Sequence, residues 1–201
     1  IRVSSEQAAI ASGRAGMSLG IDAAWLAGPE TGAQVLVVEM VRELAGRPEV
    51  DRIVLFSEAG GVPPSLARMG KVSGCSWLDA LASRAPLVDI IHRPYQPGAD
   101  VDIRRYHRVG GCVAMTILDF IAYDNPSYHE SRRSWRDYQG AFDENVCQAD
   151  GVFAISPYVA SRLERQFAHQ LSGPVRAVFP GTDHLASRPE AIASADLGPA
   201  I

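Results

Sequence analysis

The chain has 201 residues, of which 47% are hydrophobic and 21% are charged, so it can bury one good core and is typical of a globular protein rather than a disordered one. Its net charge of −4 and its scattered basic residues argue against a nucleic-acid partner, and no stretch approaches the roughly 18 apolar residues of a membrane span. Three widely spaced cysteines, Cys75, Cys112 and Cys147, fit reduced thiols better than a disulfide framework, which indicates a cytoplasmic protein.

Predicted strands and helices alternate along the chain. Residues 1–16 are rich in Ala, Ser and Gly, and we expect a linker or a docked tail there. The expected strands are, in chain order, 19–26, 51–57, 71–74, 87–92, 112–119, 151–155 and 175–179. The expected helices are 33–46, 77–84, 130–149 and one that starts after Ser156. Strands that are apolar on both faces and alternate with helices indicate a parallel sheet covered on both sides. We therefore predict a Rossmann-like, doubly wound α/β domain over residues 17–183, followed by a linker or tail at 184–201.

A glycine-rich turn joins the first strand to the first helix. It runs from Gly28 to Gly32, and Thr31 or Gly32 can cap the helix. Free backbone N–H groups and the helix dipole at such a position favour an anion such as a diphosphate. The turn lacks the third glycine of a dinucleotide-binding fingerprint and the Lys-Ser/Thr of a Walker loop, so a simple tight turn is the alternative.

Polar residues follow two of the later strands. His92, Arg93, Tyr95 and Gln96 stand at one strand end, and Asp119 ends another. A histidine can orient a ligand hydroxyl near neutral pH, and an aspartate can bind sugar hydroxyls or act as a base. Ligands of open α/β sheets gather outside the carboxyl ends of the strands, which favours function here. The alternatives are a histidine satisfied by its own loop and an aspartate that only stabilises a turn.

Other conspicuous residues are expected to be structural. Ser156, followed by Pro157, is a helix cap rather than a nucleophile, because no Gly-x-Ser-x-Gly elbow surrounds it. An aromatic stripe in the helix at 130–149 is expected to pack in the core; it consists of Trp135, Tyr138 and Phe142. The remaining histidines show no metal-ligand spacing, so we expect no metal.

Five segments occur together in one order: GIDAAWLAGPETGAQ, DIIHRPYQ, TILDFIAYDNPSYH, ADGVFAISPYVASRLERQF and VFPGTD. Over residues 19–183 this series resembles the N-terminal domain of a GT-B glycosyltransferase, close to the family-four retaining hexosyltransferases. The resemblance implies two Rossmann-like domains that face each other, the first mainly holding the acceptor and the second the nucleotide-sugar.

The resemblance also implies roles for particular residues. The donor diphosphate loop would comprise Gly28, Thr31, Gly32 and Gln34, and the acceptor side would comprise His92, Tyr95, Gln96 and Tyr123. Asp119 would be the catalytic residue that fixes a sugar hydroxyl. The implied donor is a GDP- or UDP-linked hexose, mannose among the candidates, and the implied acceptor is a glycan or a lipid-linked glycan. No cofactor is implied, and peripheral membrane contact by the parent protein is compatible with such an acceptor.

Two departures from the family pattern matter. The family usually has His-Asp where this chain has Leu118-Asp119, and a leucine cannot donate a hydrogen bond to a sugar. Only about 18 residues follow residue 183, too few for the nucleotide-sugar domain, so we expect this chain alone to be inactive. A catalytically inactive glycan- or protein-binding module is therefore the first alternative. An unrelated Rossmann-type dehydrogenase domain is the second, and the missing third glycine opposes it.

Overall fold

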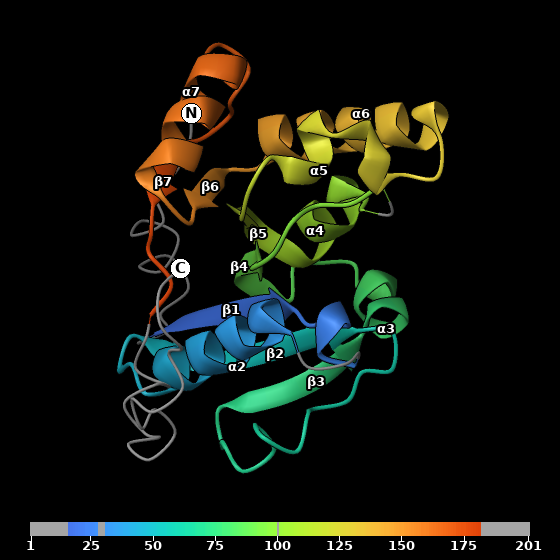
Figure 1. Cartoon of the computed structure of the whole chain (residues 1–201). Coiled ribbons are helices and arrows are strands. Elements are labelled where there is room, and N and C mark those ends of the chain that lie inside the picture. The colour runs from blue at the N-terminus through green and yellow to red at the C-terminus, as the bar shows by residue number, and fades with distance from the viewer. Residues whose placement is uncertain (1–15, 28–30, 100, 182–201) are drawn as a thin grey trace, which may run out of the picture.

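The computed structural model describes residues 16–27, 31–99 and 101–181, and within them it forms a single seven-stranded sheet (Figure 1). All neighbouring strands are parallel, in the order β3-β2-β1-β4-β5-β6-β7. The strands are β1 (Met17–Asp22), β2 (Val50–Ser57), β3 (Val72–Ser76), β4 (Val88–Arg93), β5 (Gly110–Ile117), β6 (Gly151–Ala154) and β7 (Val175–Ala177). The α-helices are α2 (Gly32–Ala45), α3 (Trp77–Ala82), α4 (Ile103–Val109), α5 (Ile121–Asp124), α6 (Arg132–Gln148) and α7 (Pro157–Phe167). Two 3₁₀ turns are η1 (Ala24–Ala27) and η2 (Pro126–Tyr128).

The sheet has a hydrophobic core on each face. On β2, Ile53 and Leu55 pack in the core that includes Val37 and Val41 of α2, whereas Val54 and Phe56 point into the opposite core. That second core draws its helical residues from α3, α4, α6 and α7. Figure 1 shows α2 against β1 and β2, with α4 and α6 beside the other half of the sheet. The predicted Rossmann-like, doubly wound α/β fold is thus confirmed.

Local capping explains where the helices begin. Thr31 caps α2: its Oγ1 accepts from the Gln34 N–H at 3.4 Å, and the Gln34 Oε1 accepts from the Thr31 N–H at 2.7 Å. Ser156 caps α7 by accepting from the Val159 N–H at 3.2 Å, and Pro157 occupies the first helical position. Both caps agree with the sequence-based prediction.

The strand order reverses at the junction between β1 and β4. From β1 the chain proceeds outward to β2 and β3, and then returns to β4 on the other side of β1. Connections that leave in opposite directions open a crevice at the carboxyl ends of the two strands, and open α/β sheets bind ligands at such a switch point. Asp22 ends β1 and Arg93 ends β4, so these two residues stand at the reversal.

Several element boundaries differ from those expected. The first strand was expected to reach residue 26 but ends at Asp22, because the Asp22 Oδ1 accepts from the Ala24 N–H at 3.0 Å and turns the chain into η1. β5 ends at Ile117, so Leu118 and Asp119 lie in the loop beyond it. The short helix α4 had no predicted counterpart. The expected tails at 1–16 and 184–201 lie outside the described residues, apart from Gly16.

The aromatic stripe of α6 is only partly in the core. Phe142 is fully buried, whereas Trp135 and Tyr138 are half-buried. Across the ranges that the structure describes, none of the helices has the length and apolarity to cross a membrane.

Candidate functional site

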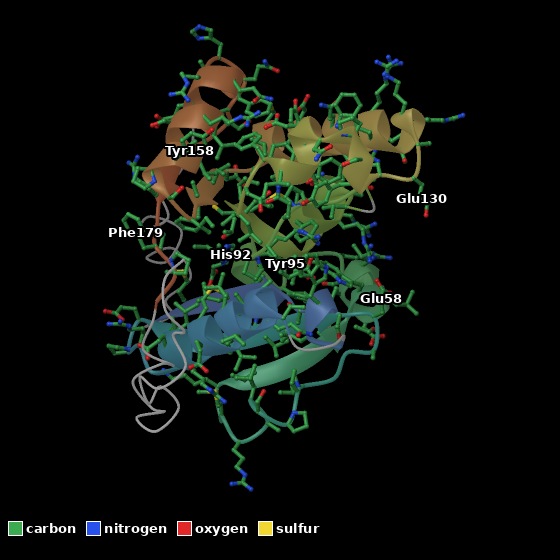
Figure 2. The ribbon with its side chains drawn as sticks, in the orientation of Figure 1. Glu58, His92, Tyr95, Glu130, Tyr158 and Phe179 are labelled. Carbon is green, nitrogen blue, oxygen red and sulfur yellow. The ribbon has the colours of Figure 1, made fainter. Side chains whose placement is uncertain are left out.

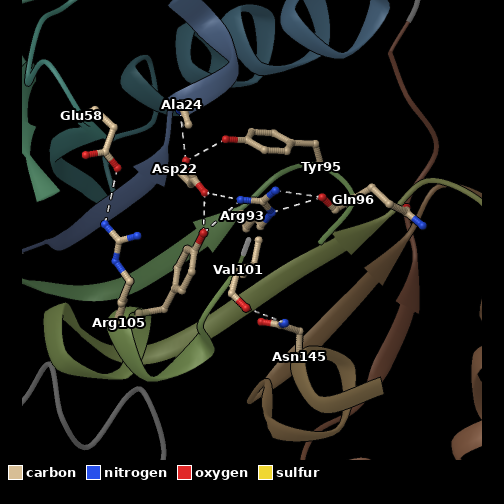
Figure 3. Close-up of polar contacts among 10 residues, drawn as sticks. Asp22, Ala24, Glu58, Arg93, Tyr95, Gln96, Val101, Arg105 and Asn145 are labelled. Atoms are coloured by element: carbon tan, nitrogen blue, oxygen red, sulfur yellow. Dashed lines mark hydrogen bonds and ion pairs between the residues drawn. The ribbon is translucent and has the colours of Figure 1, made fainter. Parts of the chain in front are cut away.

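A buried ion pair closes the switch point between β1 and β4 (Figure 3). The Arg93 Nη1 donates to the Asp22 Oδ2 at 2.7 Å, and both side chains are at most 5% exposed. Two phenols complete the cluster: Tyr95 donates to the Asp22 Oδ1 at 2.7 Å and Tyr106 donates to the Asp22 Oδ2 at 2.5 Å. With the Ala24 N–H, the carboxylate accepts from four groups, two on each oxygen.

The surroundings of this cluster keep its two phenols neutral and its guanidinium charged. Burial, together with the charge of Asp22, raises the pKa of Tyr95 and of Tyr106, so both phenols stay neutral donors. Burial alone would lower the pKa of Arg93, but Tyr106 and Asp22 raise it above its ordinary value. The Arg93 Nε and Nη2 also donate to the Gln96 carbonyl at 3.2 and 3.0 Å. Asp22 and Arg93 are therefore structural residues that join the ends of β1 and β4.

Tyr95 was expected to line the acceptor side. Its side chain is instead fully buried, its phenol is bonded to Asp22, and its ring stacks on Trp25 with centroids 4.5 Å apart. It has no surface with which to touch an acceptor directly. The structure thus places Tyr95 beneath the surface, where its ring supports Trp25.

Gln96, the second expected acceptor residue, clasps two loops together. Its Nε2 donates to the Asp119 carbonyl at 2.7 Å, and its Oε1 accepts from the Leu118 N–H at 3.0 Å. The Nε2 also lies 3.3 Å from the Tyr138 Oη. The amide group is thus committed to fixing the loop after β5 against the loop after β4, and it holds Asp119 close to the end of β4.

Asp119, the expected catalytic residue, is half-buried at the carboxyl end of β5. Its Oδ1 accepts from the Ile121 N–H at 2.8 Å, which starts α5. In the described part of the chain the Oδ2 has no recorded partner. Asp119 thus performs the turn-stabilising role that was its alternative reading, and one carboxylate oxygen remains open to a ligand.

Tyr123 belongs to an aromatic cluster against α6 and α7. Its ring contacts Phe120 and Phe142, with centroids 5.7 and 5.0 Å apart. Burial and the neighbouring Asp143 raise its pKa to about 12. The Tyr123 carbonyl accepts from the Trp135 Nε1 at 2.8 Å and from the Gln139 Nε2 at 2.9 Å. This expected acceptor residue is half-buried and anchored to α6.

His92 points away from the Asp22–Arg93 pair, because successive residues of a strand face opposite sides of the sheet. Its Nε2 shares a hydrogen bond of 2.8 Å with the Thr116 Oγ1, and its ring meets Phe153 edge-on at 5.4 Å. Burial lowers the pKa of His92 to about 4, so the imidazole is neutral at pH 7. Figure 2 shows His92 and Tyr95 in the middle of the molecule. The structure therefore does not bring His92 together with Gln96 and Asp119 in one cluster.

The expected diphosphate loop is described only in part. Gly28 lies outside the described residues, and the side chains of Thr31 and Gln34 are engaged in the capping box. The capping box satisfies the N–H groups of Thr31 and Gln34, and no acceptor among the described residues is recorded for the N–H groups of Gly32 and Ala33. A Cβ added to Gly32 would meet nothing within 4 Å, so the space beside this helix end is open. The groups able to bind an anion here are thus backbone amides.

Sequence reasoning missed Trp25, which follows the carboxyl end of β1. Trp25, in η1, is 43% exposed, stacks on Tyr95 at an interplanar angle of 16°, and through its carbonyl accepts from the Gln34 Nε2 at 2.5 Å. Its signal was hidden because residues up to 26 were assigned to the first strand. Arg93 was visible as a polar residue at a strand end, whereas Asp22 fell inside the expected strand 19–26, and their mutual contact joins positions 71 residues apart.

Within the described ranges, no group of three or more His, Cys, Asp or Glu side chains is placed to hold a metal ion. Comparison of the sequence with protein-family models and with curated proteins found no match.

Proposed function

We propose that this chain is the acceptor-holding domain of a retaining GT-B glycosyltransferase, whose parent protein transfers a hexose from a GDP- or UDP-linked donor to a glycan or lipid-linked acceptor. The observation that carries this proposal is the position of the five family-like segments. They include the ends of β1, β4, β5 and β6 and the residues just after β7, which all lie at one edge of the sheet because the strands are parallel. This is the edge where open α/β sheets bind their ligands.

The proposed chemistry is electrostatic and positional. The N–H groups of Gly32 and Ala33, which have no acceptor among the described residues, lie at the positive end of α2 and would offset charge on the departing diphosphate. The open Oδ2 of Asp119 would hold a sugar hydroxyl of the bound substrate, in a position fixed by the Gln96 clasp. Closure of a second domain over this edge would exclude water.

Turnover by the natural polypeptide that contains this chain tests the proposal. Release of GDP or UDP is measured with GDP-mannose, UDP-glucose and UDP-galactose, in the wild type and in Asp119→Asn. Asparagine keeps an Oδ1 that can accept from the Ile121 N–H, so the turn survives while the charge is lost. We expect kcat/KM to fall by about 100-fold, a typical loss for a polar catalytic group.

Asp124→Asn is the matched control, because Asp124 lies on the next helix and its carboxylate pairs with Arg162 at 2.5 Å. It should leave turnover within about twofold of the wild type. The proposal fails if no donor is turned over, or if Asp119→Asn and Asp124→Asn have the same activity.

A second function, a catalytically inactive binding module, is favoured by Leu118. This side chain packs against the core beneath α2 instead of presenting a donor to a ligand. Leu118→His in the natural polypeptide separates the two. A gain of about tenfold or more in transfer supports an enzyme that lacks its usual histidine, whereas unchanged glycan binding without transfer supports the binding module.

A further inference from the structure

Trp25 differs from the other tryptophans of the chain in its exposure. Trp77 is 4% exposed, and the Trp135 Nε1 donates to the Tyr123 carbonyl, whereas Trp25 is 43% exposed and no acceptor for its indole N–H is recorded in the described ranges. One face of the indole is covered by the Tyr95 ring, at a centroid distance of 4.5 Å. The part of the ring left uncovered by Tyr95 is therefore its other face and its edges, at the carboxyl end of β1.

The support beneath this indole is rigid. Tyr95 is held from behind by its bond to Asp22 and by the Arg93 guanidinium, which lies 4.4 Å from the ring centre. The backbone of η1 is fixed on both sides of the indole: the Ala24 N–H donates to Asp22, and the Trp25 carbonyl accepts from Gln34. A flat apolar surface that is already immobilised loses little conformational entropy when a ligand binds to it.

We infer that the outer face of Trp25 is a stacking surface for a hexose ring of the substrate; this inference rests on the proposed function. A pyranose has an apolar face of C–H groups that can lie on an aromatic ring, and its hydroxyl groups can accept from the indole N–H. Both kinds of group are available on the same residue.

The position of Trp25 favours a hexose over a nucleobase. The Gln34 side chain spans from the first turn of α2 to the Trp25 carbonyl, so the backbone of Trp25 stands within about one side-chain length of the first turn of α2, where Gly32 and Ala33 lie. In a nucleotide-sugar the hexose is bonded directly to the diphosphate, whereas the base is one ribose farther away. A diphosphate at the helix end therefore places the hexose, and not the base, beside Trp25.

Indole N–H signals in a two-dimensional ¹H–¹⁵N NMR spectrum of the chain test this inference. The probes are methyl α-mannopyranoside and methyl α-glucopyranoside, added up to about 50 mM because single sugars bind at millimolar concentrations or weaker. The Trp25 signal, assigned from its absence in Trp25→Phe, should shift in a saturable way with at least one hexoside. The signals of Trp77 and Trp135 serve as internal controls and should not move.

GDP and UDP, added in parallel, separate failure of this inference from failure of the proposed function. A Trp25 signal that responds to GDP or UDP but to neither hexoside overturns the hexose assignment, and so does a signal that responds to nothing. The proposed diphosphate site is judged separately, from the amide signals of Gly32 and Ala33. In the natural polypeptide, Trp25→Leu should raise KM at least fivefold with kcat less affected, while Tyr128→Leu, at another exposed aromatic ring, should change neither.

Discussion

Replacement of Asp22 by Asn tests whether the buried cluster at the switch point supports the fold. The substitution keeps the size of the side chain and one acceptor oxygen, but it removes the charge that Arg93 faces at 2.7 Å with both side chains at most 5% exposed. Removing one partner of a buried ion pair costs about 3–5 kcal/mol, because the other charge is left uncompensated. A typical domain has a total stability of only about 5–15 kcal/mol, so the loss should be easy to detect.

Urea unfolding at pH 7, followed by circular dichroism, measures this loss. Asp124→Asn is the control, because it removes the same charge from an Asp–Arg pair whose aspartate is 50% exposed, where about 1 kcal/mol or less is expected. Losses that agree within about 1 kcal/mol for Asp22→Asn and Asp124→Asn would refute the reasoning.

Three further predictions concern stability. The pKa of His92 in the folded protein, about 4, lies below the ordinary value of 6.5, so the unfolded chain binds a proton first as the pH falls. The contribution of neutral His92 to stability should therefore be fully present above about pH 6.5. The free energy of unfolding should fall by up to about 3 kcal/mol by pH 4. His92→Gln should flatten this dependence in unfolding measured between pH 4 and 7, and equal slopes for the two proteins would contradict the assignment. Gln96→Leu should cost about 1–3 kcal/mol in urea unfolding, because it leaves the Leu118 N–H without its acceptor and the Asp119 carbonyl without its donor; an unchanged midpoint would show that the clasp is dispensable. Ser156→Ala should cost about 1 kcal/mol through loss of the α7 cap, and a loss below about 0.3 kcal/mol would count against it.

Most of the fold could be predicted from the sequence because its signals are local. The caps at Thr31 and Ser156 and the apolar runs of the strands depend on neighbours within a few residues, and the alternation of strands and helices is enough to indicate the parallel sheet. The end of β1 could not be predicted in this way. It depends on the Asp22 carboxylate turning back to the Ala24 N–H, in a segment that is otherwise apolar enough to continue as a strand.

The candidate site was predictable as a region but not residue by residue. Polar residues after strand ends do gather at one edge, yet His92 and Arg93 are adjacent in sequence and face opposite sides of the sheet. Tyr95 lies fully buried because it contacts Asp22, 73 residues away, and Trp25. These long-range contacts decide which side chains are buried in structural contacts and which stay accessible to a ligand. No local sequence pattern encodes such contacts.

Calorimetric titration of the natural polypeptide with GDP-mannose and UDP-glucose gives the most direct test of the proposed site. It asks whether the sheet edge at the carboxyl ends of β1 and β4, with the start of α2 beside it, takes part in binding a nucleotide-sugar. The comparison is between the wild type, Gly32→Val and Gly61→Val, since a Cβ would meet nothing within 4 Å at either glycine and both variants should fold. We predict that at least one donor binds the wild type and Gly61→Val equally, and that Gly32→Val binds it at least tenfold more weakly, a difference of about 1.4 kcal/mol. Equal affinity in all three proteins, or no binding of either donor, would contradict the role given to this edge.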